Sequence, residues 1–434
     1  MQKILSKVKG RVDSAEVFFV RSHQTEIGYD GWKLKRSTVV QKEGYSLRVV
    51  KNGRIGFAAT TDPNGIDLMV ENAVATAAFG ETVAIEFPSA QNFATPNIFD
   101  PKLAGLSIEQ MIDYGKLFIA QCERYRGIAD LSFESQKMTI EVKLANTSGF
   151  EGGYEKTVFS YGGYLSRVKE GDVFMVGDGF GSTHLPEMTE ALRKMTEPFH
   201  RKMELADNIV TVSSGKMPVI FDPKGSMVLL LPIRAGINGR SVYTKSSPLV
   251  GKEGQKLFDE RLSIYDDGTL DRRLGSSPFD DEGVAKTRID IVKNGVFENF
   301  IFDIVTAAKA GRSSNGCGER GIFSPPSPSL SNFAVAAGNV PYADMIGSID
   351  EGLLVEGVLG LGQGNIISGA FSNPVGTAFK IEKGEPVGRV KNASIAGNIY
   401  NDMREIAALG DTQELVYGSY LVPFIRLDTL NIAS

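Results

Sequence analysis

Strand-like and helix-like segments are grouped along this chain of 434 residues instead of alternating strictly. Residues 15–60 are rich in β-branched and aromatic side chains, and strand-like residues return over 134–178 after two helical stretches. Glycine supplies 48 residues, well above the usual share of about 7%, which indicates many tight turns. Grouped strands with tight turns predict an α+β fold, in which antiparallel sheets are flanked by helices.

A chain of this length holds two or three domains, at roughly 150 residues per domain. The segment 81–104 contains Pro-rich turns and is predicted to be a linker, and the sequence changes character again near 205–216. We therefore expect an N-terminal α/β domain over residues 1–90, a central domain over 105–208 and a C-terminal domain over 214–434.

Local signals predict individual turns and helices. Asn52-Gly53 and Asn294-Gly295 are predicted hairpin turns, because both residue types tolerate positive φ angles. The stretch 107–110 matches a capping box at the start of a helix. Apolar residues at helical spacing predict further helices over residues 225–235 and 399–409.

Composition and charge exclude several classes of function. Lysine and arginine number 47 against 52 aspartate and glutamate, a net charge of −5, so we expect no nucleic-acid partner. Two cysteines, Cys122 and Cys317, are too few for a disulfide framework and fit a reducing compartment. The longest apolar run, Met227 to Ile233, is too short to span a bilayer, and no signal peptide is recognisable. We expect a soluble, cytoplasmic protein with no membrane partner.

The common signatures of hydrolases are missing. The only histidines are His23, His184 and His200, and no two lie three to five positions apart. A zinc site on one helix needs two imidazoles at that spacing, so HExxH and its one-residue-longer relative are both absent. The GxSxG nucleophile elbow and the GxxxxGK(S/T) phosphate loop are absent as well.

Three stretches carry groups with potential chemistry. Asp280-Asp281-Glu282 could bind a divalent cation or act as general acid and base, although a solvated loop end or strand entry is the favoured interpretation. Cys317, between Arg312 and Arg320, could have a lowered thiol pKa and act as a nucleophile, but no histidine lies nearby in sequence. Residues 360–364 could cradle a phosphate or a peptide carbonyl, but strand-like residues follow, which favours a sharp turn.

Several stretches in the last half of the chain are distinctive: SVYTKSS (241–247), SSPFDDEGVAKTR (276–288), VKNGVFENFIFDIVTAAKAG (292–311), GQGN…SGAFSN (362–373) and FKIEKGEPV…IAGN (379–398). Together they resemble the TldD/PmbA family, which is also labelled modulator of DNA gyrase. NGRIGFAATTD (52–62) resembles the family's N-terminal domain, so the likeness covers nearly the whole chain. The resemblance implies that residues 214–434 form a TldD/PmbA-type metalloprotease-like domain.

The same resemblance implies a cytoplasmic peptidase system that acts on unfolded or peptide substrates, in peptide maturation and antitoxin turnover. In the TldD branch a helix carries HExxxH, whose histidines bind zinc and whose glutamate activates water. Aligned through the flanking IFD and NGR stretches, these positions fall on Leu230, Leu231 and Ala235. A further zinc ligand of the family, a cysteine, falls near Tyr417.

Hydrocarbon side chains neither ligate zinc nor move a proton, so the chain resembles the PmbA/TldE branch, a non-catalytic subunit without a zinc site of its own. Zinc is expected only in a TldD-like partner subunit that carries HExxxH. The family works as dimers, so a homodimer is the other assembly that we expect. By the same resemblance, Arg240, Gly362, Gln363 and Gly364 are expected to line a cleft for an unfolded peptide.

Two alternative functions stay open. The chain could be an independent peptidase with a non-zinc site at Cys317 or at residues 280–282, which chelator-insensitive cleavage by the purified chain would favour. It could instead be a binding protein that modulates DNA gyrase, as the family's older label suggests. The net charge of −5 and the absence of a basic stretch longer than KLKR disfavour DNA binding. In the first alternative the chain is an enzyme, and in the second it is not.

Overall fold

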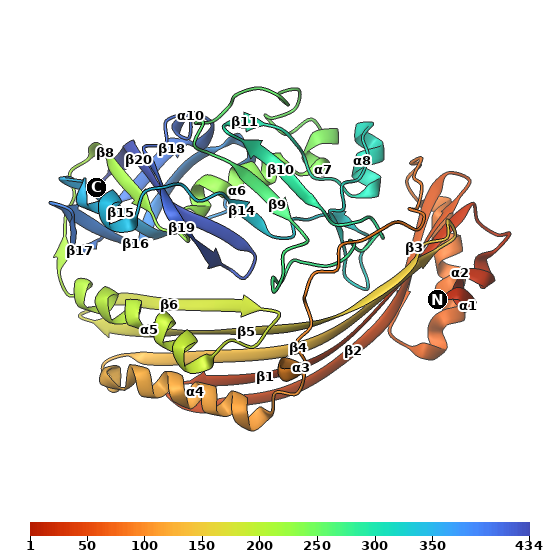
Figure 1. Ribbon diagram of the computed structural model, residues 1–434, viewed down its shortest axis with the longest axis horizontal. Coiled ribbons are helices and arrows are strands. Elements are labelled where there is room, and N and C mark those ends of the chain that lie inside the picture. Colours follow the sequence, from red (N-terminus) through yellow and green to blue (C-terminus); the bar gives the residue numbers. More distant parts are fainter.

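The computed structural model describes residues 1–434 and shows two layers (Figure 1). The first half of the chain forms a long, curved antiparallel sheet, and the last half lies above it in the hollow of the curve. Both halves combine strands with helices, so the predicted α+β class is confirmed. No helix is long and apolar enough to cross a membrane.

The first sheet has six strands in the order β3-β2-β1-β4-β5-β6. Four of them are 17 to 19 residues long, against about 5–6 for a usual strand, so each reaches both ends of the sheet. Asn52 and Gly53 join β2 to β3 with φ angles of 51° and 71°, which confirms the predicted turn. The strands are β1 (Ser14–Asp30), β2 (Lys33–Lys51), β3 (Arg54–Thr60), β4 (Asp130–Asn146), β5 (Glu151–Lys169) and β6 (Asp172–Ser182).

Alternating side chains give the long sheet two different faces. On β1, Val17, Ile27 and Tyr29 pack with the helices, whereas Glu16 and Phe18 contact residues of the C-terminal half. Two helix pairs serve the first face at its opposite ends, each with its own buried apolar cluster. They are α1 (Gln2–Val8) with α2 (Ile66–Thr76), and α4 (Ile108–Cys122), which has the predicted capping box, with α5 (Met188–Leu205).

The ranges expected as an N-terminal domain (1–90) and a central domain (105–208) share this one sheet, which differs from the prediction of separate domains. Strand β1 pairs along its length with β2 on one side and with β4 on the other. The pairing of β1 with β4 joins segments about a hundred residues apart, and no local sequence signal reports such a contact. The segment 81–104 runs between the two ranges and carries the short helix α3 (Pro101–Ala104).

The C-terminal half is built around a closed ring of strands. In this ring β8 pairs with β15, β15 with β16, β16 with β18, β18 with β20, and β20 again with β8. A closed ring leaves no exposed edge among its members. The ring strands are β8 (Gly215–Phe221), β15 (Glu351–Val358), β16 (Ala370–Glu382), β18 (Ser394–Asn398) and β20 (Tyr420–Ala433).

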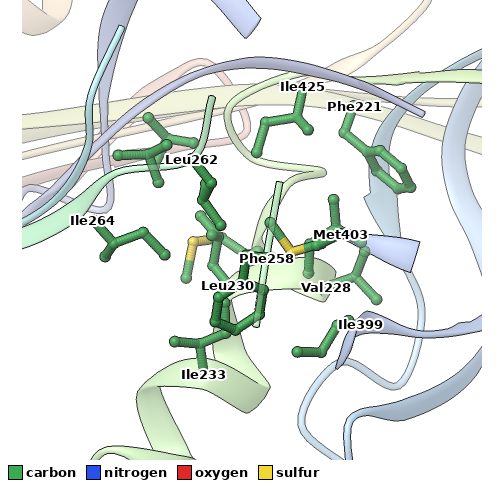
Figure 2. Close-up of a cluster of buried hydrophobic side chains, with 14 of the residues drawn as sticks. Phe221, Val228, Leu230, Ile233, Phe258, Leu262, Ile264, Ile399, Met403 and Ile425 are labelled. Atoms are coloured by element: carbon green, nitrogen blue, oxygen red, sulfur yellow. The ribbon is translucent and has the colours of Figure 1, made fainter. Parts of the chain in front are cut away.

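Helix α6 (Met227–Gly236) supplies much of the apolar core inside the C-terminal half. Leu230 has 0% of its surface exposed, and Figure 2 shows it in the same cluster as Phe258 and Met403. Burying a leucine side chain stabilises a fold by roughly 1.5–3 kcal/mol. Pro232 lies inside the helix, where it removes one backbone hydrogen bond. This helix is therefore held by its packing.

The prediction of a last helix over residues 399–409 is mostly wrong. Helix α10 covers only Ile399–Asp402, and strand β19 begins at Ala408. The backbone between them is held by tertiary contacts, because the Asp259 carboxylate accepts from the Ile406 N–H at 3.2 Å and Arg261 donates to the Ile406 carbonyl at 2.9 Å. Apolar periodicity alone could not report these distant partners.

Shorter elements connect these parts. Helix α8 (Ile304–Ala310) ends at Gly311, which takes the left-handed conformation with a φ angle of 66°. The others are η1 (Pro63–Gly65), η2 (Ala77–Phe79), η3 (Glu123–Tyr125), β7 (Ile209–Val210), α7 (Gly239–Tyr243), β9 (Ile264–Asp267), β10 (Arg288–Lys293), β11 (Val296–Phe297), β12 (Gly318–Glu319), β13 (Ser327–Pro328), β14 (Phe333–Val335), α9 (Tyr342–Gly347), η4 (Ile366–Ser368), β17 (Glu385–Val390) and β19 (Ala408–Val416).

The turn at Asn294-Gly295 generates a test of the fold. Both residues have positive φ angles, and a side-chain carbon at Gly295 would lie 2.4 Å from the Phe258 carbonyl oxygen. Gly295→Val should therefore lower the free energy of unfolding by roughly 1–3 kcal/mol, measured by urea denaturation. Gly53→Val is the matched control, because Gly53 occupies an equivalent turn with open space around it. Equal losses in the two variants would show that the contact with Phe258 does not matter.

Candidate functional site

A cavity of about 800 Å³ lies between the long sheet and the C-terminal half, and we call it the cleft. Its floor comes from strands β1, β4, β5 and β6, and its roof from Lys224, Leu274, Tyr417 and Gly418. A large concave space between two layers is the usual place for a ligand. The cleft residues are Glu26, Ser132, Glu134, Gln136, Ser160–Tyr164, Gly177–Gly181, Lys224, Leu274, Tyr417 and Gly418.

Five glycines lie in the floor of the cleft, among larger side chains. Strand β6 contributes Gly177, Gly179 and Gly181, and β5 contributes Gly162 and Gly163. Strand backbones that carry no side chains can be approached closely by another polypeptide backbone. Sequence reasoning predicted strands here but missed the site, although the alternating glycines of β6 were its visible signal.

The charged groups of the cleft are paired within the protein. Glu26 and Glu134 both bind the Arg36 guanidinium, Glu26 at 2.5 Å. Lys224 pairs with Asp178 at 2.6 Å, and its ammonium also donates to the Gly177 carbonyl at 3.1 Å. A lysine that caps an outer carbonyl of β6 protects this edge strand from uncontrolled pairing. The exposed aromatic rings of Tyr164 and Tyr417 complete the surface.

A smaller cavity of about 210 Å³ brings together several residues that the family resemblance selected. Leu231 from α6 lines it together with Gly362 and Gln363 from the loop after β15. A side-chain carbon at Gly362 would lie 3.7 Å from the Leu231 side chain, so helix and loop are in close proximity. Gly364 is exposed beyond this cavity, and Arg240 is exposed on α7 and lines none of the described cavities.

The residues at the family's zinc positions do not fit a metal ion. Leu230 is packed in the core, Leu231 faces the small cavity, and Ala235 is half-buried. None has a lone pair to donate. Tyr417 lies in the turn between β19 and β20 and lines the cleft, not the cavity of Leu231. No group of three or more His, Cys, Asp or Glu side chains is arranged to hold a metal ion.

The favoured interpretation of Asp280-Asp281-Glu282 as a solvated loop is wrong, because the side chains of Asp280 and Glu282 are buried. Arg48 from β2 binds Glu282 at 2.6 Å and Glu16 at 3.2 Å, and Arg320 binds Glu16 at 2.7 Å. We call Glu16, Arg48, Glu282 and Arg320 the interlayer ion cluster. It joins the long sheet to the C-terminal half, a structural role that uses these carboxylates fully.

Burial shifts the pKa values of the acidic groups in the interlayer ion cluster and directly beside it. Burial raises the pKa of Glu282 to about 8 and that of Asp281 to about 6. The oxygens of Glu282 are occupied by Arg48 and by the Ile304 N–H at 2.7 Å. Asp280 accepts from the N–H groups of Glu282, Val284 and Gly318, at 3.0, 2.9 and 2.8 Å.

The hypothesis of a nucleophilic Cys317 is also not supported. Only 1% of its surface is exposed, and burial raises the pKa of its thiol above the ordinary value. Arg312 pairs with Glu253 at 2.6 Å and Arg320 with Glu16, so neither arginine activates the sulfur. A buried, protonated thiol is a poor nucleophile.

A second charged group of residues joins the layers near α5. Lys202 on α5 binds Glu356 on β15 at 2.7 Å. Asp222, at the end of β8, is buried, and burial followed by the charge of Glu356 raises its pKa well above the ordinary value. The Asp222 carboxylate accepts from the Gly225 N–H at 2.6 Å, just before α6 begins. Ionic contacts therefore join the two layers in two separate places, at the interlayer ion cluster and near α5.

The chain is similar in sequence and in fold to known proteins. Residues 214–434 match the family model described as PmbA/TldA metallopeptidase C-terminal domain, and residues 15–77 match PmbA/TldA metallopeptidase domain 1. An uncharacterized protein of Methanocaldococcus jannaschii is 26% identical over 92% of this chain and 92% of its own length. Metalloprotease PmbA of Escherichia coli O157:H7 is 27% identical over 65% of this chain and 61% of its own length. The crystal structure of TldE from Thermococcus kodakarensis matches all of both chains with a TM-score of 0.91 at 22% identity, which shows a shared fold.

The interlayer ion cluster predicts a large effect of one substitution. Arg48→Met removes the partner of two buried carboxylates, Glu16 and Glu282, and should lower the free energy of unfolding by about 3–5 kcal/mol. Arg21→Met is the matched control on β1, because Arg21 also binds two glutamates but lies exposed to water. This substitution should lower the free energy of unfolding by a much smaller amount. Urea denaturation measures both, and equal effects would contradict the role of burial.

The same cluster predicts a dependence of stability on pH. The pKa of Glu282 is about 8 in the folded protein and lower in the unfolded chain, so the folded state binds more protons between about pH 4.5 and 8. The contribution of Glu282 to the free energy of unfolding therefore decreases as pH rises through this window. Glu282→Gln does not ionise, so urea midpoints measured across the window should vary less than in the unchanged protein. A variant with the same or a steeper decrease would contradict the assignment.

Proposed function

Because this chain belongs to the PmbA/TldD family of metallopeptidases, we propose that it is the zinc-free subunit of a two-subunit cytoplasmic peptidase. Its partner is a TldD-like relative that carries HExxxH and supplies the zinc. The substrate class is unfolded or short peptide, as in peptide maturation or antitoxin turnover. The chain itself contributes the binding surface for the peptide.

The observation that carries this proposal is the environment of α6. A catalytic zinc needs three protein ligands and an open position for water. At the corresponding positions this helix has Leu230 sealed in the core, with Leu231 and Ala235 as further hydrocarbon groups. A polar ligand at position 230 would have to be buried among Phe258, Met403 and their neighbours. Burying a polar group that has no hydrogen-bond partner costs free energy.

The cleft supports a role in holding peptide. Its floor of glycines and serines leaves room for an extended backbone, and its charges are already paired within the protein. Tyr417 has 63% of its surface exposed at the roof, where its ring can pack on a bound chain. A folded protein could not enter a space of this volume, which fits the proposed preference for unfolded substrates.

The loop beside Leu231 supports the proposal that a protein partner binds the C-terminal half. Leu359 and Leu361 line the small cavity together with Leu231, and 58% and 39% of their surfaces are exposed. Exposed apolar groups of this kind are typical of protein contacts. The dimer, with a TldD-like chain or with a second copy, is proposed to use this surface and to bury at least about 1,000 Å².

Metal content and cleavage test the proposal together. The purified chain should hold well under one equivalent of zinc in elemental analysis and should not cleave an unfolded peptide. Addition of the HExxxH-bearing relative should give cleavage that a chelator abolishes. A relative in which the glutamate of HExxxH is replaced by glutamine is the control and should give no cleavage. One tightly bound zinc per chain, or chelator-insensitive cleavage by the chain alone, would contradict the proposal.

A further inference from the structure

A third cavity, of about 290 Å³, adjoins the cleft, and we call it the side cavity. The two spaces share the lining residues Leu274, Tyr417 and Gly418, so they adjoin. Leu274 packs into room left by two glycines, since side-chain carbons at Gly181 and Gly418 would lie 2.4 and 2.8 Å from it. The side chain of Leu274 is therefore the boundary that a chain lying in the cleft would have to pass to reach the side cavity.

Arg234 is the one arginine in the wall of the side cavity. It extends from the last turn of α6, is exposed, and forms no ion pair or hydrogen bond through its guanidinium within the chain. Its guanidinium carbon lies 5.5 Å from the centre of the Tyr420 ring, and that ring packs on Phe333 at 5.9 Å. Stacking on an aromatic ring keeps the planar guanidinium ordered while its N–H groups stay free.

Other polar residues line the same cavity as Arg234. Ser329 and Ser419 line the same cavity, and their hydroxyls form no hydrogen bond within the chain. Glu319 lines it as well, and it forms no ion pair with Arg234. A guanidinium with free N–H groups and nearby hydroxyl donors matches a carboxylate, whose two oxygens it can bind side by side.

We propose that the side cavity binds a carboxylate group of the peptide substrate, with Arg234 as its charge partner and Ser329 and Ser419 as hydroxyl donors. This inference rests on the proposed function, because the peptide reaches the side cavity from the cleft. The carboxylate belongs either to the C-terminus of the peptide or to an acidic side chain. Both sources present the same two oxygens to Arg234.

Fluorescence anisotropy with three labelled, unfolded peptides that differ only at their C-terminal end tests the proposal on the purified chain. The first peptide has a free C-terminal carboxylate, the second has a C-terminal amide, and the third has the amide with aspartate as its last residue. The first or the third should bind roughly tenfold or more tightly than the second, as expected for a charged hydrogen-bonded pair. Preference for the first alone identifies the C-terminus, and preference for the third identifies an acidic side chain.

Two variants assign the effect to the side cavity. Arg234→Gln should abolish the preference while leaving binding of the amidated peptide unchanged, because the cleft is intact. Arg404→Gln, at an exposed arginine that lines none of the described cavities, should retain the preference. Equal affinity for all three peptides, or a preference that survives Arg234→Gln, would overturn the carboxylate site alone. Absence of binding for every peptide would overturn the proposed function and this site with it.

Discussion

The pairing of Arg48 with Glu16 and Glu282 is the interaction on which the arrangement of the two layers depends. These side chains are buried where the long sheet meets the C-terminal half, and Arg320 extends the pairing back to Glu16. A buried charge without its partner is costly, so the layers cannot slide or separate at this point without exposing or orphaning ions. The cluster therefore holds this end of the long sheet against the C-terminal half.

The long strands and the closed ring of strands have different roles in the two layers. Strands of 17 to 19 residues extend from the interlayer ion cluster to the glycine-rich floor of the cleft. The ring of strands holds α6 by its apolar face, with Leu230 in the core. The remaining faces of the same helix reach two different spaces, since Leu231 lines the small cavity and Arg234 the side cavity. One helix thus contributes an apolar side chain to one cavity and an arginine to another.

Local chemistry explains which predictions succeeded. The turns at Asn52-Gly53 and Asn294-Gly295 and the capping box at 107–110 depend on residues that are neighbours in the chain, so their sequence signals were sufficient. The interpretation of residues 280–282 failed because three successive acidic groups are normally solvated, and their arginine partner Arg48 lies more than two hundred residues away. For the same reason the glycines of β6 could be seen in the sequence but not assigned to a cleft.

By itself, the sequence determined the class of fold, the turns and the apolar character of α6, and its family resemblance led to the expectation that Leu230, Leu231 and Ala235 stand at the positions of the zinc motif. Only the tertiary structure decided that residues 1–90 and 105–208 share one sheet, that the acidic run is buried, and that Arg234 and Tyr417 line adjoining spaces. The physical reason is range. Propensities, caps and side-chain chemistry act over a few residues, whereas strand pairing, ion pairing and cavity walls join groups that the chain brings together only when it folds.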